Sequence, residues 1–314
     1  MIYLSLIVTM LFWGGTFIAG RILAQSVPPA DAAFLRFTLA ALSMAVLVRL
    51  IDGRLTLPPK NQIVRLLLLG FTGVFCYNIC FFNGLKYIQA GRASLIIALN
   101  PMVITVGAVL LFGERLSRLQ VAGLFVSLTG AFLVISNGAP ALLLSGGLGL
   151  GEAAIVGCVI SWASYSLIGK QVLVDMSPLS AVFYSALFGA VMLFLVTLRD
   201  RTLANMTGYP LEAWLSLLFL GIFGTAAGFS LYYRAITKIG AARSGVFINL
   251  VPLFSLLLAW LILGETVKGS VLFGGAILMA GVYLTNRPPR SGSRSAGKTS
   301  SSTESVRRRG QQTG

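Results

Sequence analysis

The chain of 314 residues contains no histidine and only nine acidic residues. A Ser–His hydrolase, or an acyltransferase that uses a histidine base, therefore has no base here. The carboxylates all fall in expected loops, in the C-terminal tail or at the ends of apolar segments, whereas an intramembrane aspartyl protease needs two buried aspartates. These absences predict that the protein is not an enzyme and that it holds no metal and no cofactor.

Cysteine is also scarce, and glycine is abundant. The three cysteines, Cys76, Cys80 and Cys158, lie inside apolar segments, where free thiols act as small packing residues. The sequence therefore predicts no disulfide framework. Several of the 35 glycines are expected to allow close contact between helices: Gly14, Gly15, Gly123, Gly130, Gly274, Gly275 and Gly281.

Charged residues make up only 11% of the chain, hydrophobic residues make up 56%, and the mean hydropathy is +0.88. These values indicate a membrane protein. Apolar runs of about 20 residues recur, each long enough to cross about 30 Å of hydrocarbon as a helix and too uniformly apolar for a barrel strand. We expect ten transmembrane helices, at residues 2–23, 31–51, 62–85, 92–112, 117–136, 152–173, 178–198, 212–235, 243–263 and 268–286.

The first segment and the basic residues predict the orientation. No basic stretch precedes the first segment, so we expect a helix of the mature protein and not a cleavable signal peptide. Lys and Arg are more numerous at the segment ends on the side of the two termini, which predicts that both termini are cytoplasmic.

The tail at 287–314 is rich in Ser, Gly and Arg and is expected to be disordered. The net charge of +15 fits contact with the lipid bilayer; no basic helix face indicates nucleic acid.

The chain contains an internal repeat. Residues of the first half recur in the second at offsets of 149 or 151 positions: Trp13 as Trp162, Gly20 as Gly169, Pro101 as Pro252, Gly113 as Gly264 and Glu114 as Glu265. Each copy holds five segments, an odd number, so the second copy enters the membrane from the opposite side. Such inverted repeats are typical of carriers that work by alternating access. We expect a first repeat at 1–136, a linker at 137–151 and a second repeat at 152–286.

Three stretches also carry a resemblance to a known family. WGGTFIAGRIL in the first segment, PPADAAFLRFTLAAL in the second, and a fourth segment that runs from AGRAS through NP to FGE resemble EamA-type members of the drug/metabolite transporter superfamily. The resemblance implies a ten-helix carrier with cytoplasmic termini. It also implies a central cavity lined by helices 1, 3, 4, 6, 8 and 9, with helices 5 and 10 peripheral, and export of amino acids or other small metabolites.

Aromatic and amide side chains near mid-depth are the candidates for binding a substrate. Trp13 and Trp162 lie near the centres of the first and sixth segments, although tryptophan prefers the membrane interface. They suggest a polar cavity that both rings reach; the alternative is that the rings pack between helices. The predicted set also contains Tyr77, Asn78, Asn100, Ser161, Tyr165, Tyr232 and Asn249. For the three asparagines the alternative is pairing between helices.

Pro101 and Pro252 interrupt apolar runs at equivalent positions. Each removes a backbone N–H, so the helix should be kinked or loosened near residues 98–100 and 249–251. The freed carbonyls are tolerated where they meet water, a side chain or a ligand. We interpret both prolines as hinges; the alternative is a kink that only shapes the bundle.

Charges at the ends of the fourth and ninth segments have the sign that the helix dipole disfavours. Arg92 and Arg243 are expected at N-termini, and Glu114 and Glu265 at C-termini. We expect them to anchor the helices at the membrane surface, with ion pairs at the cavity mouths as the alternative. Arg36, inside the second segment, is expected to extend to the lipid head groups.

The predicted function is export of small metabolites, most readily aromatic or neutral amino acids, across the bacterial inner membrane. The aromatic lining makes the chain similar to YddG-like exporters of aromatic amino acids. Without a titratable group at mid-depth, transport is expected to be facilitative. A multidrug extruder and a non-transporting membrane sensor or scaffold are the alternatives.

Overall fold

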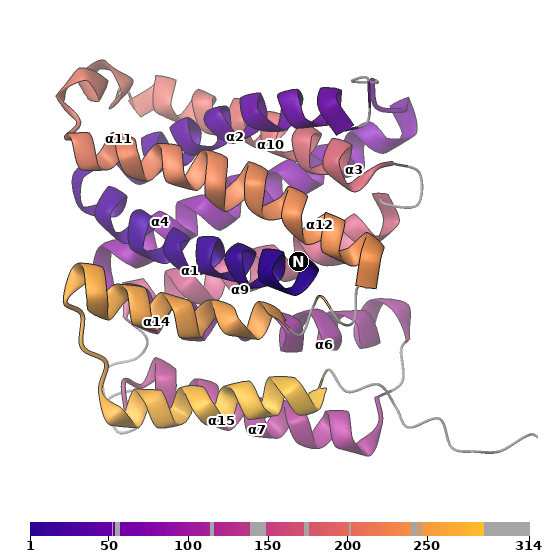
Figure 1. The fold of residues 1–314 in the computed structure, drawn as a ribbon, viewed down its shortest axis with the longest axis vertical. Coiled ribbons are helices and arrows are strands. Elements are labelled where there is room, and N and C mark those ends of the chain that lie inside the picture. Colours follow the sequence, from indigo (N-terminus) through magenta and orange to yellow (C-terminus); the bar gives the residue numbers. More distant parts are fainter. Residues whose placement is uncertain are drawn as a thin grey trace, which may run out of the picture.

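Helices packed side by side form the described structure (Figure 1). The computed structural model describes residues 1–51, 53, 57–113, 116–138, 149–172, 176–200, 202–239, 244 and 247–285, and these ranges contain no strand. In chain order the elements are α1 (Ile2–Ser26), α2 (Pro29–Ile51), η1 (Lys60–Gln62), α3 (Ile63–Leu69), η2 (Gly70–Cys76), α4 (Tyr77–Tyr87), α5 (Ala90–Ile97), α6 (Asn100–Phe112), α7 (Arg118–Ile135), α9 (Leu150–Val172), α10 (Pro178–Asp200), η3 (Thr202–Gly208), α11 (Leu211–Leu218), η4 (Phe219–Ala227), α12 (Gly228–Ile239), η5 (Phe247–Asn249), α14 (Leu250–Leu263) and α15 (Gly269–Thr285). The tail expected at 287–314 and most of the expected linker lie outside these residues.

Eight helical segments of the described chain are long and apolar enough to cross a membrane, and two shorter apolar ones, Phe247–Leu263 and Gly269–Thr285, follow them. Within the described ranges this matches the expected number of about ten transmembrane helices. The all-α membrane fold is therefore confirmed. The ninth helix, expected from residue 243, is described from Phe247 onward.

The helix ends follow local backbone chemistry. Pro29 and Pro178 begin α2 and α10, where the missing N–H of proline costs no hydrogen bond. Gly113 follows α6 with φ 66° and Gly264 follows α14 with φ 64°, a left-handed conformation that suits glycine. The glycine of each Gly-Glu pattern therefore stops a helix at the same place in the two halves.

Two of the long helices contain a wider turn. Lys60–Tyr87 is one continuous helical segment whose residues Gly70–Cys76 are π-helical, and Phe219–Ala227 is π-helical within the segment Leu211–Ile236. The two π segments overlap at an offset of 151 positions. Such segments occur frequently at functional sites. Both of these contribute residues to the central cavity described below.

The helices α7 and α15 pack together at one edge of the bundle, away from its centre (Figure 1). They are the fifth and tenth helices, which the resemblance placed at the periphery. A Cβ atom added at Gly123 would lie 2.6 Å from the backbone nitrogen of Thr285, and one at Gly274 would lie 2.7 Å from Cβ of Leu133. The expected role of these glycines in close helix contact is confirmed.

Gly123→Ala should therefore destabilise the protein. The added methyl group meets backbone, which cannot rotate away, and overpacking of this kind costs about 1–3 kcal/mol of unfolding free energy. Thermal unfolding of the purified protein in detergent measures the effect. Gly269→Ala is the control, because a Cβ at that glycine meets nothing within 4 Å; equal melting temperatures for the two variants would contradict the assigned contact.

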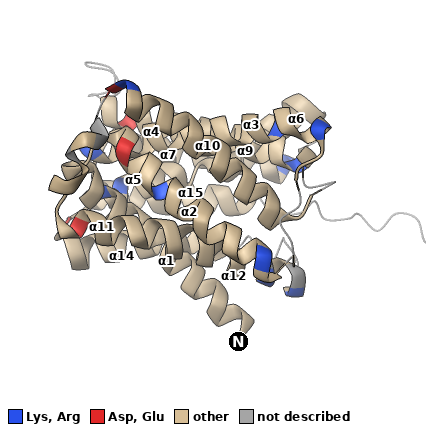
Figure 2. Ribbon diagram, turned by 90° about the horizontal axis from the view of Figure 1, so that it is seen from above, with Lys and Arg blue, Asp and Glu red and all other residues tan. Residues whose placement is uncertain are grey.

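Side-chain contacts define the two ends of the bundle. Tyr3 stacks on Phe247 at a ring distance of 6.0 Å, so α1 and α14 begin at the same end, which we name the Met1 face. Arg21 lies 3.6 Å from the carboxylate of Glu265, so the same helices end together at the other end, which we name the distal face. Charged residues gather toward these two ends and leave the middle of the bundle largely uncharged (Figure 2).

Candidate functional site

A cavity of about 1060 Å³ lies in the centre of the bundle. Its wall is built from both sequence halves, with residues of α1, α2, α3, η2, α4, α5 and α6 from the first and of α9, α10, η4, α12, η5, α14 and α15 from the second. The second, seventh and tenth helices, α2, α10 and α15, thus contribute to the wall although the resemblance did not place them there. Its volume is at the upper end of the range that small-molecule sites occupy. Most of the wall is apolar or aromatic, with a few polar groups.

The cavity extends to the Met1 face. Its wall includes Gly169 near the end of α9, Pro178 at the start of α10 and Tyr283 near the end of α15. All three helix ends lie at the Met1 face. In the other direction the wall stops at Phe17 and Ser94, one or more turns short of the distal face. The described part of the wall therefore extends toward the Met1 face and stops short of the distal face.

Packed side chains separate the cavity from the distal face. Phe17 meets Phe81 edge to face at 5.5 Å, and Phe81 meets Phe82 in the same way at 5.5 Å. Leu23 and Leu85, which follow in the direction of the distal face, are fully buried. This layer closes the cavity on that side.

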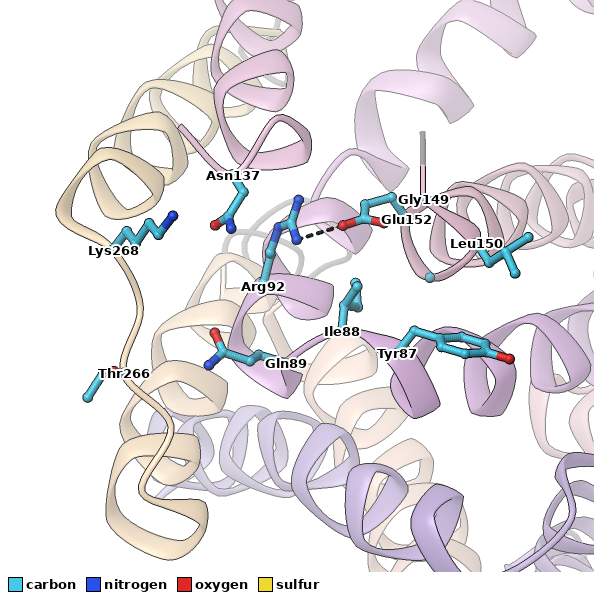
Figure 3. A pocket seen from close by; sticks show the side chains of 11 residues that line it. Tyr87, Ile88, Gln89, Arg92, Asn137, Gly149, Leu150, Glu152, Thr266 and Lys268 are labelled. Atoms are coloured by element: carbon cyan, nitrogen blue, oxygen red, sulfur yellow. Dashed lines mark ion pairs between the residues drawn. The ribbon is translucent and has the colours of Figure 1, made fainter. Parts of the chain in front are cut away.

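Two ion pairs at the distal face connect the sequence halves. Arg21 of α1 pairs with Glu265 beyond α14 at 3.6 Å, and Arg92 of α5 pairs with Glu152 of α9 at 2.6 Å. Arg92 also donates to the carbonyls of Val134 and Ile135 at the end of α7. Figure 3 shows Arg92 directed toward Glu152 across a polar hollow of about 490 Å³.

These pairs correct the expectation that the charged helix ends serve as surface anchors. The Arg92 and Glu265 side chains are only 13% and 10% exposed, because each finds an opposite charge on another helix. The structure supports ion pairs for these two residues. They lie at the distal face, where the cavity is closed, and not at an open cavity mouth. Glu114 and Arg243 lie outside the described residues.

The predicted tryptophans stand in two separate aromatic clusters on the cavity wall. Trp13 lies 5.1 Å from Tyr232 and 5.6 Å from Phe229, and its indole N–H donates to the carbonyl of Gly224 in η4 at 3.1 Å. Trp162 stacks on Tyr165 at 5.1 Å and lies 5.6 Å from Tyr77. Both rings line the cavity and also pack between helices. The expected cavity position and the alternative, packing between helices, are therefore both correct for these tryptophans.

Contacts across the two halves repeat at the same offsets. Gly73 of η2 packs against the ring of Tyr165, and Gly224 of η4 packs against Thr16. Gly73 and Gly224 are 151 positions apart, and Thr16 and Tyr165 are 149 apart. In each case the π segment of one half meets the first helix of the other.

Eight of the nine predicted binding residues line the cavity. They are Trp13, Tyr77, Asn78, Asn100, Trp162, Tyr165, Tyr232 and Asn249. Ser161 does not line it, because the part of α9 that forms the wall begins at Trp162.

Asn78 and Asn100 differ in their contacts. Asn78 is fully buried; its Oδ1 accepts from Arg36 at 3.0 Å and its Nδ2 donates to the carbonyl of Val74 at 2.7 Å. It therefore serves the pairing between helices that was the alternative for it. The Oδ1 atom of Asn100 is buried and has no hydrogen-bond partner among the described residues, so it can accept a bond from a solute.

Both helix breaks occur close to the predicted prolines. The helix α5 ends at Ile97, two residues with 3₁₀-like angles follow, and α6 begins at Asn100 with Pro101 in its first turn. In the second half the 3₁₀ turn Phe247–Asn249 precedes α14, which contains Pro252. Both prolines line the cavity, as do Ile97 and Ile248, whose carbonyls lose the donor that proline lacks.

Arg36 is the residue that the sequence interpretation placed wrongly. It is only 8% exposed and lines the cavity. Its Cζ atom lies 5.3 Å from the ring centre of Phe37 and 5.7 Å from that of Phe81. The hydrogen bond to Asn78 and these two rings keep the guanidinium inside the bundle instead of at the head groups. The available signal was that Arg36 is the one basic residue inside the second apolar segment, because an ionisable residue within a membrane span is a functional-site candidate by default.

Comparison with known proteins decides the class. The EamA-like transporter family matches residues 1–136 and 149–287. This chain belongs to that family. The expected resemblance is confirmed, and the protein is a multi-pass membrane transporter and not an enzyme.

Individual relatives agree with this class. The transporter is 28% identical to the uncharacterized transporter YyaM of Bacillus subtilis, over 91% of this chain and 93% of that protein. It is 29% identical to a probable terminal-alkyne amino-acid exporter of Streptantibioticus cattleyicolor, over 90% of this chain and 92% of that protein. A solved crystal structure has the same fold, with a TM-score of 0.59 at 22% identity, and the match covers 90% of this chain and 97% of that one.

The ion pair at Glu265 of this EamA-like transporter should make its stability depend on pH. Burial raises the pKa of Glu265, although Arg21 and the backbone N–H groups of Gly91 and Ala90 favour the charged form. A pKa that is higher in the folded protein means that folding favours the protonated carboxyl, so this contribution to stability is present at low pH and is lost as the pH rises through the raised pKa. The melting temperature of the wild type should therefore fall relative to that of Glu265→Gln as the pH rises.

Glu212→Gln is the matched control for this measurement, because Glu212 is an exposed carboxylate in the first turn of α11. A difference between the wild type and Glu265→Gln that stays constant from acid to neutral pH would contradict the assigned cost of burial.

Proposed function

We propose that this transporter exports aromatic or neutral amino acids by alternating access, with two inverted five-helix repeats moving around the central cavity. The observation that carries the proposal is a cavity with walls from both halves that extends toward the Met1 face and is closed by packed side chains toward the distal face. One binding site that is reached from one side at a time is what alternating access requires.

The repeated contacts support the inverted arrangement of residues 1–136 and 152–286. The π segments, the helix breaks and the terminating glycines each occur once in either half. The breaks beside Pro101 and Pro252 are the points at which we propose that the helices bend.

The wall of the cavity supports an amino acid as the solute. The rings of Trp13, Trp162 and Tyr77 offer apolar faces to a hydrophobic side chain. The unpartnered Oδ1 of Asn100 and the carbonyls freed by the prolines can accept bonds from an ammonium group. The name of the relative from Streptantibioticus cattleyicolor includes amino-acid export, which is consistent with this chemistry.

The titratable groups support facilitative transport. No carboxylate occurs among the described residues that line the cavity, so a proton carrier of the usual kind is absent from that wall. Arg36 is charged but does not release its proton in the physiological range. We propose that both termini are cytoplasmic in the bacterial inner membrane, which makes the Met1 face the side from which an exported solute enters.

Efflux from proteoliposomes tests the proposal. Vesicles that contain the purified transporter and labelled phenylalanine or threonine should lose label faster than vesicles without protein, and an imposed pH gradient should not drive the flux. No acceleration for any member of an amino-acid panel would overturn amino-acid export. Flux of hydrophobic cationic dyes in its place would favour a multidrug extruder.

A further inference from the structure

The guanidinium of Arg36, a residue of the cavity wall, has an unused donor. Its Nη1 donates to Oδ1 of Asn78 at 3.0 Å, whereas its Nε is buried and has no hydrogen-bond partner among the described residues. A buried unpaired donor on a charged group is costly. More than nine-tenths of Arg36 is buried. An unpaired donor in such a place indicates a partner that binds there.

The charge of Arg36 is also uncompensated. Among the described residues that line the cavity, Arg36 is the one with a formal charge. The ion pairs found in the described chain involve Arg21 and Arg92, and neither includes Arg36. The rings of Phe37 and Phe81 stabilise the cation but do not neutralise it. A buried charge without a counter-charge is unfavourable, so an anionic solute in the cavity would relieve the cost.

We infer that Arg36 binds the carboxylate of the transported solute, and that the solutes are therefore carboxylate-bearing molecules. This inference rests on the proposed function and names the chemical class of its substrate. The planar guanidinium forms strong charge-assisted hydrogen bonds with a carboxylate. Asn78 accepts from Nη1 and donates to the carbonyl of Val74 in its own helical segment, so it is a positioning residue. A small movement of the guanidinium would bring its remaining donors to the solute. Cationic solutes without a carboxylate are repelled from the cavity.

The inference also explains an asymmetry of the repeat. Arg36 corresponds to Ser185 at the offset of 149 positions, and both residues line the cavity. The Ser185 hydroxyl donates to the carbonyl of Val182 at 2.9 Å, so it is already used within α10. One half therefore supplies the anion site and the other supplies a neutral wall, which orients a solute that has a single carboxylate.

Binding of a matched pair of ligands to purified protein tests the inference. L-phenylalanine and L-phenylalaninamide differ only in the carboxylate. The wild type should bind phenylalanine about tenfold or more tightly than the amide. Arg36→Gln should weaken binding of phenylalanine by about the same factor and leave or improve binding of the amide, because the variant loses the repulsion. Arg36→Lys, which keeps the charge, should retain part of the preference.

Two outcomes would overturn the inference. One is equal affinity of the wild type for the two ligands. The other is a loss in Arg36→Gln that affects both ligands equally, which would assign Arg36 a structural role. Arg49→Gln removes an exposed arginine from the last turn of the same helix and should leave the preference unchanged.

A flux measurement separates this inference from the proposed function. Phenethylamine has no carboxylate. If proteoliposomes with wild-type protein transport labelled phenethylamine as fast as phenylalanine, the proposed role of Arg36 is wrong, but the proposed export of amino acids is not affected. If they transport no member of the amino-acid panel, amino-acid export is wrong, and the comparison of ligand binding still decides the role of Arg36.

Discussion

Trp162→Ala should slow amino-acid efflux by about tenfold or more, without lowering the amount of protein in the membrane. The ring stacks on Tyr165 and lies beside Tyr77 on the cavity wall. Aromatic pairs contribute about 0.5–1.5 kcal/mol beyond the burial of their area, and about 1.4 kcal/mol corresponds to a factor of ten. Tyr77→Ala should have an effect of the same size. Efflux of labelled phenylalanine from proteoliposomes, normalised to protein content, measures both.

Trp260→Ala is the matched control for these variants. Trp260 is 60% exposed on α14 and is not among the residues that line the cavity. Removing it deletes the same ring from the outer surface of the bundle, so flux should be close to that of the wild type. Unchanged flux in both Trp162→Ala and Tyr77→Ala would remove the proposed aromatic wall.

A disulfide across the distal face should stop transport almost completely. A Cβ atom placed on Gly151 at the start of α9 would lie 2.9 Å from Cβ of Tyr87 at the end of α4. A disulfide needs a Cβ–Cβ distance of about 3.5–4.5 Å, so cysteines at these positions can form the bond after a small shift apart. The bond would join the first half to the second on the side that is closed in the described conformation. Flux through Tyr87→Cys/Gly151→Cys should fall more than about tenfold on oxidation, because a covalent bond outlasts any thermal opening.

Reduction provides the internal control for this experiment. A thiol reductant should restore flux in the double variant, and the two single variants should be insensitive to oxidation, which excludes bonds to Cys76, Cys80 or Cys158. Full flux through a protein that gel mobility shows to be cross-linked would mean that the distal face does not open during transport.

The sequence predicted those features that depend on local backbone chemistry. The breaks near Pro101 and Pro252 follow from the missing N–H, and the stops at Gly113 and Gly264 follow from the left-handed conformation of glycine. Because each signal occurs twice, the repeat could be found without any knowledge of packing. Most residues predicted for the cavity wall do line it. Aromatic and amide side chains at mid-depth of an apolar segment need a polar cavity or a partner on another helix, so these side chains indicate where such a cavity lies.

Features that depend on tertiary packing were not predicted. The position of Arg36 is set by Asn78 on α4 and by the ring of Phe81, and segment hydropathy contains no information about such neighbours. The pair Arg92–Glu152 joins two helices that begin far apart in the chain. The π segments insert a wider turn over only seven and nine residues, too short a stretch to change the apolar pattern of the long helices around them.

Labelling of a single cavity position from both sides of the membrane tests alternating access most directly. Ala98 lies at the break between α5 and α6 and lines the cavity, and Ala98→Cys can be made in a background in which Cys76, Cys80 and Cys158 are replaced by serine. A membrane-impermeant maleimide should modify this thiol from either side of the membrane, with rates that change in opposite directions when a transported amino acid is added to one side. Labelling from one side only, with and without the amino acid, would contradict the proposal.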